Sequence, residues 1–271
     1  MATLREAIAA RARTGKGSLL AYLMGGSVPP ETYLETVDVL CSAGLTGLEV
    51  GFPFSDPMAE GPVIQKAASD ALAAGMRWEG LLRFLPQVAS RVPCAVMTYL
   101  NVLQHRGIPV ALGDLAAAGA SAVIVPDLPV EESAAFRSAG RKVGVDVVLL
   151  ASPATSEERL RTLARRTGAF LYLVSRYGTT GVTNEKSLEG ARTGPELSPL
   201  ISAVHRDRPG LPVLVGFGVS TPEDVRRYRA MGADGVIVGS ALQQLVARKA
   251  PSQEIADLAR ALAGALEETH G

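Results

Sequence analysis

Short runs of apolar residues recur along the chain, separated by longer stretches in which apolar residues repeat at helical spacing. The short runs are continuously apolar rather than alternating, which is typical of parallel strands buried on both faces. Eight alternations of strand and helix predict the α/β class and a (β/α)₈ TIM barrel that forms one domain over residues 1–271. The predicted strands span residues 18–23, 47–50, 94–99, 122–125, 146–150, 169–174, 212–216 and 235–238.

Polar residues mark where the helices begin. The segment Thr221-Pro222-Glu223-Asp224 combines an N-cap threonine, a proline at the first position and two acids near the positive end of the helix dipole. Helices are predicted over residues 131–142, 156–166 and 221–231, and a further N-terminal helix is predicted before the first strand.

The units that follow strands 2 and 6 are longer than the rest. They take 48 and 43 residues between strand markers, whereas the other units take 22 to 28. Loops that follow barrel strands line the catalytic face, so the extra length is predicted to cover a substrate or to contact a partner. The first long unit includes an additional helix near residues 77–89. The second has a loop rich in glycine and hydroxyl groups, residues 175–183, which is predicted to act as a lid.

One carboxylate interrupts the apolar pattern of strand 2. Glu49 lies where a buried strand should carry no charge, and the segment after it holds Asp56 and Glu60 among prolines and glycines that no central strand tolerates. A helix is predicted to restart at Gly61-Pro62, because proline suits the first helical turn. A strand-end carboxylate that faces a carboxylate-bearing loop is a candidate acid–base site.

Two interpretations of Glu49 are open. It could be a buried acid in a structural ion pair, although no basic residue lies within fifteen positions on either side. Alternatively, burial among apolar neighbours raises its pKa, so that it gives and takes a proton near neutral pH.

Four other residues also have structural alternatives. Asp56 could be a turn acid beside Pro57, and Glu60 could cap the helix that follows it. Tyr172 is either a core aromatic or a hydroxyl directed at the pocket. Asp127 is predicted to order its own loop by accepting backbone N–H bonds.

Glycines end strands 7 and 8, in Gly216-Phe217-Gly218 and Gly239-Ser240. Glycines let backbone N–H groups approach an anion closely, and helix N-termini add positive partial charge. Two such motifs on adjacent strands predict the phosphate site that is usual in these barrels. Neither motif contains lysine or arginine, so backbone donors are expected to bind a small phosphorylated substrate.

Composition excludes several other classes of protein. The 27 basic and 27 acidic residues balance, so no electrostatic footprint for nucleic acid or an anionic membrane is expected. The two cysteines are expected to be reduced, and the absence of CxxC or HExxH spacing predicts no metal site. The arginine-rich start could suggest a transit peptide, but a surface helix is favoured. With no signal peptide and no spanning apolar run, a cytoplasmic location is expected.

The order of these motifs resembles the tryptophan synthase alpha chain family. Residues 49–57, Glu-Val-Gly-Phe-Pro-Phe-Ser-Asp-Pro, are similar to the family's signature, and the match extends over nearly the whole chain. The supporting segments are residues 61–65, 97–101, 125–129, 175–181, 216–218 and 239–240.

The resemblance implies retro-aldol cleavage of indole-3-glycerol phosphate to indole and glyceraldehyde 3-phosphate without a cofactor. It also implies a partner, a beta chain that carries pyridoxal phosphate, in an α₂β₂ assembly. By this resemblance Glu49 moves protons, Glu60 accepts the indole N–H, and Tyr172 lies beside the reacting carbons. The remaining implied residues are Gly181, Gly218, Gly239 and Ser240 for the phosphate, Tyr22, Tyr99 and Thr180 for the indole pocket, and Asp56 and Pro57 for partner contact.

The chain departs from the family pattern at three places. Glu60 stands where the family has an aspartate, strand 1 ends in Leu23-Met24-Gly25-Gly26 rather than a Thr-Ala-Gly-like turn, and Val102 replaces a common proline. The glutamate leaves two alternatives open: a weakly active subunit that mainly activates a beta chain, or a stand-alone indole-3-glycerol phosphate lyase. Another lyase or isomerase of the phosphate-barrel type is the third alternative.

Overall fold

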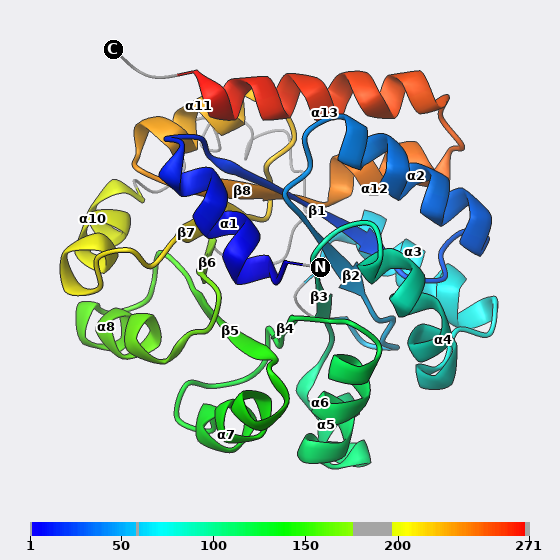
Figure 1. Ribbon diagram of the computed structural model, residues 1–271, viewed down its shortest axis with the longest axis horizontal. Helices are drawn as coiled ribbons and strands as arrows, with labels where there is room; N and C mark the ends of the chain where they lie inside the picture. The colour runs from blue at the N-terminus through cyan, green and yellow to red at the C-terminus, as the bar shows by residue number, and fades with distance from the viewer. Residues whose placement is uncertain (1, 58–59, 176–196, 269–271) are drawn as a thin grey trace.

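The computed structural model describes residues 2–57, 60–175 and 197–268. Its strands close into one parallel barrel in which each strand pairs with the next in sequence and β8 returns to β1 (Figure 1). The predicted (β/α)₈ barrel is therefore confirmed. The strands are β1 Ser18–Met24, β2 Gly47–Gly51, β3 Cys94–Met97, β4 Ala122–Ile124, β5 Asp146–Ala151, β6 Leu171–Val174, β7 Val213–Gly216 and β8 Gly235–Val238.

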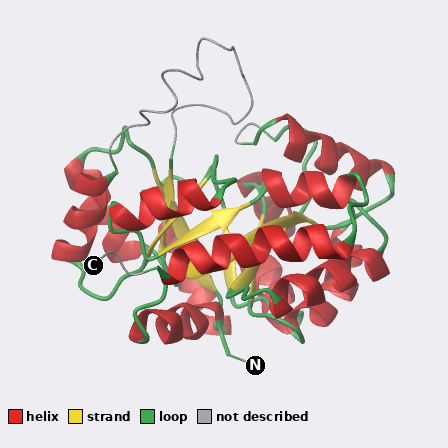
Figure 2. Cartoon of the chain, turned by 90° about the horizontal axis from the view of Figure 1, so that it is seen from above, coloured by secondary structure: helices red, strands yellow, loops and turns green. Residues whose placement is uncertain are grey.

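Helices surround this barrel, as Figure 2 shows. Within the described residues they are α1 Leu4–Arg13, α2 Pro30–Ser42, α3 Pro62–Ala73, α4 Trp78–Ala89, α5 Leu100–Arg106, α6 Ile108–Ala117, α7 Ser133–Val143, α8 Glu157–Arg166, α10 Ser198–Asp207, α11 Pro222–Ala230, α12 Ser240–Ala247 and α13 Ser252–Glu267. None of the described helices is long and apolar enough to cross a membrane.

Alternate residues of each strand face two different hydrophobic cores. In β2, Leu48 and Val50 pack outward against the helices, so Glu49 between them points into the barrel. The interior is filled by residues such as Leu20, Phe170 and Leu214, all without solvent exposure. A charge on this inner face is therefore surrounded by packed apolar side chains.

Two helices close the ends of the barrel interior. Leu4 and Ile8 of α1 belong to the interior core, and α1 lies across the end at which the strands begin (Figure 1). A capping box of Thr3 and Glu6 fixes the start of this helix. At the opposite end, Ile64 of α3 joins the same core. The barrel is thus closed below by α1 and partly covered above by α3.

Most predicted boundaries agree with the structure, with one clear difference. The helix start at Thr221 is confirmed as a capping box with Asp224, and α3 and α4 begin where the restart and the extra helix were predicted. The strand predicted over residues 94–99 ends at Met97, because Tyr99 already acts as the N-cap of α5. The sequence over residues 94–99 looked like one buried strand because Tyr99 is also buried, although it lies at the start of α5.

Candidate active site

Glu49 is buried inside the barrel. Its side chain is 0% exposed, and neither carboxyl oxygen has a hydrogen-bond partner within residues 2–57, 60–175 and 197–268. Burial raises its pKa to about 8, and the nearby charge of Glu60 adds to the shift. The structural ion pair considered from the sequence is absent among the described residues. The predicted rise in pKa is present, so Glu49 can hold a proton at neutral pH and release it.

Glu60 reaches the same interior from the loop between β2 and α3. Only 5% of this residue is exposed, and its carboxylate accepts a hydrogen bond of 2.6 Å from the Tyr99 hydroxyl. Its pKa is raised by burial, lowered by the bond from Tyr99 and raised again by the charge of Asp127. The helix that follows begins at Gly61 without a side-chain cap, so Glu60 is not a capping acid.

The loop that carries Glu60 is fixed at both ends. Near its start, the Phe54 ring stacks on the Tyr99 ring, with centroids 4.9 Å apart. Near its end, the Gln65 side-chain amide donates to the backbone oxygen of Glu60 at 2.9 Å. The direction of the Glu60 carboxylate is therefore set by contacts from β3–α5 and α3.

Asp127 supports this arrangement in a way that the sequence did not predict. Its carboxylate accepts the backbone N–H of Leu100 at 2.8 Å, across 27 residues. Asp127 was expected to order its own loop by accepting backbone N–H bonds. In the structure it accepts a backbone N–H from the neighbouring loop instead. Because Leu100 directly follows Tyr99, Asp127 anchors the segment that presents the tyrosine. This role depends on a contact between two loops, and the pattern of residues in the sequence does not show such contacts.

Two interior tyrosines depend on glycines in neighbouring strands. A Cβ added at Gly51 would collide with the Tyr22 ring, and one added at Gly216 would collide with the Tyr172 ring. Both tyrosines are almost fully buried. Burial raises the pKa of each hydroxyl well above its ordinary value, and the charges of Glu49 and Glu60 add to this. Both hydroxyls therefore stay protonated beside the two carboxyl groups.

The glycine motifs after β7 and β8 lie at the same mouth, although only one leads to an open helix terminus. Phe217 and Gly218 both have positive φ, 62° and 82°, a backbone conformation that is uncommon for phenylalanine. The N-terminus of α12 begins at Gly239 without a side-chain cap. The N-terminus of α11, by contrast, is capped by its own Asp224. Both motifs line the cavity, and the predicted anion site at their helix starts stays a prediction.

Glu49, Glu60, the two interior tyrosines and the glycine motifs after β7 and β8 line one cavity of about 240 Å³. Sequence reasoning missed its apolar walls, because Met97, Phe217 and Ile237 have the pattern of ordinary core residues. Tyr99 is not among the lining residues and instead donates its hydroxyl to Glu60. The indole-pocket role that the resemblance implies for Tyr99 stays a prediction. The lining residues are Tyr22, Glu49, Glu60, Ile64, Met97, Tyr172, Phe217, Gly218, Val219, Ser220, Ile237, Gly239 and Ser240.

Two expected residues, Asp56 and Pro57, do not line the cavity. Thr180 and Gly181 are outside the described residues. Asp56 is exposed and accepts the Ser55 hydroxyl at 2.6 Å, while Pro57 beside it is half-buried. In the described part of the chain, no group of three or more His, Cys, Asp or Glu side chains could hold a metal ion.

The fold and the cavity define a class of protein. A barrel with a protonated interior carboxyl, a second carboxylate and an uncapped helix start after β8 at the same cavity has the groups of an acid–base enzyme. The chemistry available is proton transfer to and from a bound substrate.

Comparison with known proteins identifies the family. The family model described as tryptophan synthase alpha chain matches residues 8–269. A relative of that name from Gloeobacter violaceus is 42% identical over 89% of this chain and 86% of its own. One from Methanopyrus kandleri is 38% identical over 94% of this chain and 90% of its own. The chain belongs to the tryptophan synthase alpha chain family, whose members are the lyase subunit that cleaves indole-3-glycerol phosphate.

Solved structures agree with this assignment. Tryptophan synthase from Mycobacterium tuberculosis superposes with a TM-score of 0.85 at 28% identity, covering 99% of this chain and 100% of that one. The alpha subunit from Legionella pneumophila superposes with a TM-score of 0.81 at 30% identity, covering 98% and 99%.

Proposed function

We propose that this chain cleaves indole-3-glycerol phosphate in the cavity that holds Glu49 and Glu60. The observation that carries the proposal is the Glu49 carboxyl. It is fully buried, has no hydrogen-bond partner in the part of the chain that the structure describes, and has a pKa raised to about 8. Such a group is protonated before the reaction and can take back a proton after it has given one. Both steps are required when a carbon–carbon bond to an indole ring is broken.

Glu49 performs both proton transfers in this mechanism. It first donates its proton to indole C3, which makes the ring an electron acceptor. The carboxylate that results then removes the proton from the hydroxyl on the adjacent side-chain carbon. The bond from that carbon to C3 breaks, its electron pair returns to the ring, and the hydroxyl-bearing carbon becomes the aldehyde of glyceraldehyde 3-phosphate. Glu49 ends protonated, as it began.

Glu60 stabilises the charged ring while the bond breaks. Protonation at C3 places positive charge on the indole nitrogen, and the Glu60 carboxylate accepts that N–H. The bond from Tyr99 favours the ionised form of Glu60, which this role requires. The phosphate binds at Gly218, Gly239 and Ser240, where the uncapped start of α12 supplies backbone donors. Gly181 and Thr180 complete the proposed phosphate site and indole pocket.

The partner completes the proposal. The family pairs with a beta chain, and we assign the contact to the exposed loop at Asp56 and Pro57 in an α₂β₂ assembly. The beta chain carries pyridoxal phosphate, whereas the lyase step uses the side chains of this chain alone. A cytoplasmic location is part of the same proposal, because the substrate is a phosphorylated metabolite.

The test is release of indole from indole-3-glycerol phosphate by the purified chain, alone and with a beta chain. Stoichiometric indole and glyceraldehyde 3-phosphate are expected, with faster turnover when the partner is present. No cleavage under either condition would contradict the proposal.

A further inference from the structure

A small hollow lined by arginines lies at the end of the barrel away from the active site. It has a volume of about 190 Å³ and is walled by the start of β5 and by Thr167 and Gly168 before β6. The last turns of α7 and α8 flank it. Its five guanidinium groups, hereafter the arginine hollow, are those of Arg5, Arg137, Arg141, Arg165 and Arg166.

Positive charge in the arginine hollow is almost uncompensated. Among the described residues that line it, Asp146 is the one carboxylate, and Arg5 already donates to both of its oxygens at 2.9 and 2.5 Å. Arg166 donates to the backbone oxygen of Val130 at 3.1 Å. Arg137, Arg141 and Arg165 have no carboxylate partner among the described residues. Three guanidinium groups thus converge on one concave space without an anion to neutralise them.

Arginines without a carboxylate partner also occur elsewhere, but the hollow gathers three of them in one small cavity. On the same helix α8, Arg159 pairs with Glu131 and Arg161 pairs with Asp207. On the far side of the barrel, Arg248 pairs with Glu254 and Arg260 with Asp257. The chain has equal numbers of basic and acidic residues, so the unpaired arginines of the hollow do not result from a shortage of carboxylates.

Helix dipoles account for only part of the cluster. Cations near the C-termini of α7 and α8 are favoured, which suits Arg141, Arg165 and Arg166. Arg137 lies earlier in α7 and is half-buried, where a dipole gives it no benefit. Its pKa is lowered by burial and by the neighbouring charges of Arg141 and Arg166. The cluster therefore costs free energy that a bound anion would recover.

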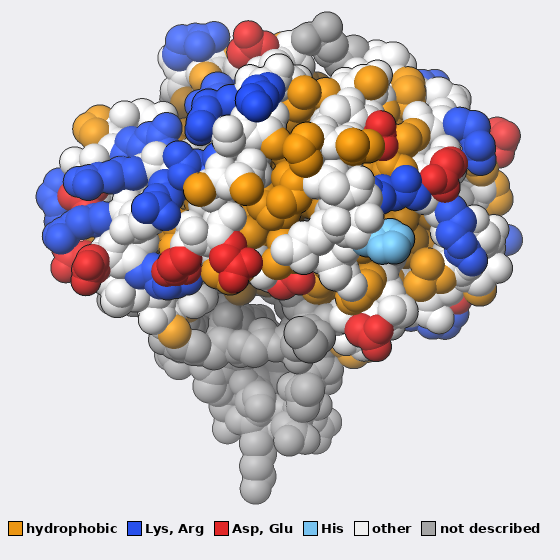
Figure 3. Space-filling model, turned by 90° about the horizontal axis from the view of Figure 1, so that it is seen from below, with side chains coloured by type: hydrophobic (Ala, Val, Ile, Leu, Met, Phe, Trp, Pro, Cys, Tyr) orange, Lys and Arg blue, Asp and Glu red, His pale blue; other side chains and the backbone are white. Residues whose placement is uncertain are grey.

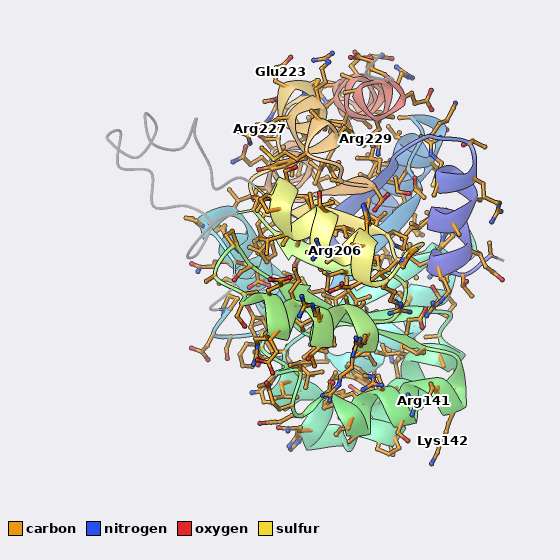
Figure 4. The ribbon with its side chains drawn as sticks, turned by 90° about the vertical axis from the view of Figure 1, so that its left-hand side faces the viewer. Arg141, Lys142, Arg206, Glu223, Arg227 and Arg229 are labelled. Atoms are coloured by element: carbon orange, nitrogen blue, oxygen red, sulfur yellow. The ribbon has the colours of Figure 1, made fainter. Side chains whose placement is uncertain are left out.

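Figures 3 and 4 show how the cluster is presented. Seen from below in Figure 3, Lys and Arg side chains gather on the side of the molecule where α7 and α8 lie. Figure 4 labels Arg141 and Lys142 at the end of α7, on the same side of the barrel as α1. Arg141 and Arg165 are exposed, and the hollow shares no lining residue with the cavity that holds Glu49.

We propose that the arginine hollow binds a small oxyanion with more than one negative charge, of the phosphate or pyrophosphate class. Arginine presents a planar fork of donors that matches phosphate oxygens in pairs, and charge-assisted bonds of this kind are the strong ones. The small volume suits a compact anion rather than a macromolecule. The balanced total charge of the chain gives no wider surface for nucleic acid.

The test is calorimetric titration of the full chain with inorganic pyrophosphate at low ionic strength. No other phosphate compound is present, because glycerol 3-phosphate is itself a divalent oxyanion that would compete for the hollow. The difference between wild type and a variant of the hollow assigns the binding to the hollow. The informative variant is R141Q/R165Q, which removes two exposed side chains. The matched control is R248Q/R260Q, which changes the net charge equally but alters two ion-paired arginines, one just after α12 and one in α13.

Wild type and the control are expected to bind pyrophosphate alike, whereas R141Q/R165Q weakens binding by about tenfold or more, since two charge-assisted bonds are lost. Without pyrophosphate, R141Q/R165Q should unfold at the same temperature as wild type or higher, because repulsion is relieved. Absence of binding to wild type, or an equal loss in the control, would overturn the proposal. Because indole release is measured separately, failure here leaves the lyase assignment unaffected.

Discussion

The Tyr99 hydroxyl donates a buried hydrogen bond of 2.6 Å to the Glu60 carboxylate, while the Tyr99 ring stacks on Phe54. One tyrosine at the start of α5 therefore holds both ends of the loop between β2 and α3. A glutamate is one methylene longer than an aspartate, and the position of this hydroxyl sets where the longer side chain delivers its carboxylate. Glu60, which stands where the family pattern has an aspartate, is thus positioned by Tyr99.

Replacing Tyr99 with phenylalanine should lower indole release by about ten- to a hundredfold, because displacement of a reacting group by about 1 Å can cost that much. Loss of the bond also raises the pKa of Glu60, since that bond lowers it in the wild type. The pH below which kcat declines should therefore be higher in Tyr99→Phe than in wild type. Steady-state indole release measured across pH tests both effects.

Tyr33→Phe is the matched control for this variant. It removes another buried hydroxyl, which donates to the Leu23 backbone oxygen at 3.2 Å and does not line the cavity. The control should keep the wild-type pH profile. An unchanged profile in Tyr99→Phe would show that the tyrosine does not position Glu60.

Replacing Glu60 with aspartate should lower activity rather than raise it. The shorter side chain withdraws from the Tyr99 hydroxyl by about one methylene, on the order of 1 Å, and the loop is fixed by Phe54 and Gln65. Steady-state indole release by Glu60→Asp and Glu60→Ala beside wild type measures this. Faster turnover in Glu60→Asp would mean that the glutamate is merely tolerated, and full activity in Glu60→Ala would remove Glu60 from the mechanism.

The fold was predictable because its signal repeats. Continuous apolar runs and well-marked helix starts such as Thr221 located the strands and several helices, and the strand-end acid Glu49 stood out against its apolar neighbours. Each of these signals is local, so a single sequence is sufficient to read it. The strand end at Met97 was missed because burial, not hydrogen bonding, determines the apolar pattern there.

Contacts between loops were not predictable from the sequence. The bond from Tyr99 to Glu60 spans 39 residues, and the bond from Leu100 to Asp127 spans 27. Neither has a spacing rule, since both depend on how separate loops meet at the barrel mouth. The capping of α11 by Asp224 was visible in the sequence, whereas the uncapped start of α12 required the geometry.

Glu49 should destabilise the fold at high pH. Its pKa is about 8 in the folded chain against an ordinary value of 4.5, so both states are protonated below pH 4.5 and the cost of ionisation grows between those two values. Glu49→Gln should match wild type at pH 4.5 and exceed its free energy of unfolding at pH 9 by a few kcal/mol, at roughly 1.4 kcal/mol per unit. Urea unfolding at both pH values measures this. An equal difference at the two pH values would contradict the raised pKa.

Activity should depend on Gly216, which lies against the Tyr172 ring. Gly216→Ala places a methyl group against the tyrosine ring, so the ring must move and indole release should fall by about a hundredfold. Gly113→Ala in α6 is the control, because its added methyl meets no atom within 4 Å and should raise stability by about 0.5–1 kcal/mol. Thermal unfolding and indole release, measured on both variants, separate the two effects. Wild-type turnover in Gly216→Ala would show that the position of Tyr172 is not critical.

The most direct test of the account is indole release by Glu49→Gln, measured together with binding of glycerol 3-phosphate. The amide keeps the shape of the side chain but cannot move a proton, and general acid–base groups contribute about 10²–10⁴-fold to rate. Because Glu49 lies inside the barrel and the proposed phosphate donors lie at the starts of other elements, ligand affinity should stay within about twofold of wild type while turnover falls at least a hundredfold. Turnover above a tenth of the wild-type value, with ligand still bound, would show that Glu49 is not the proton-transfer group.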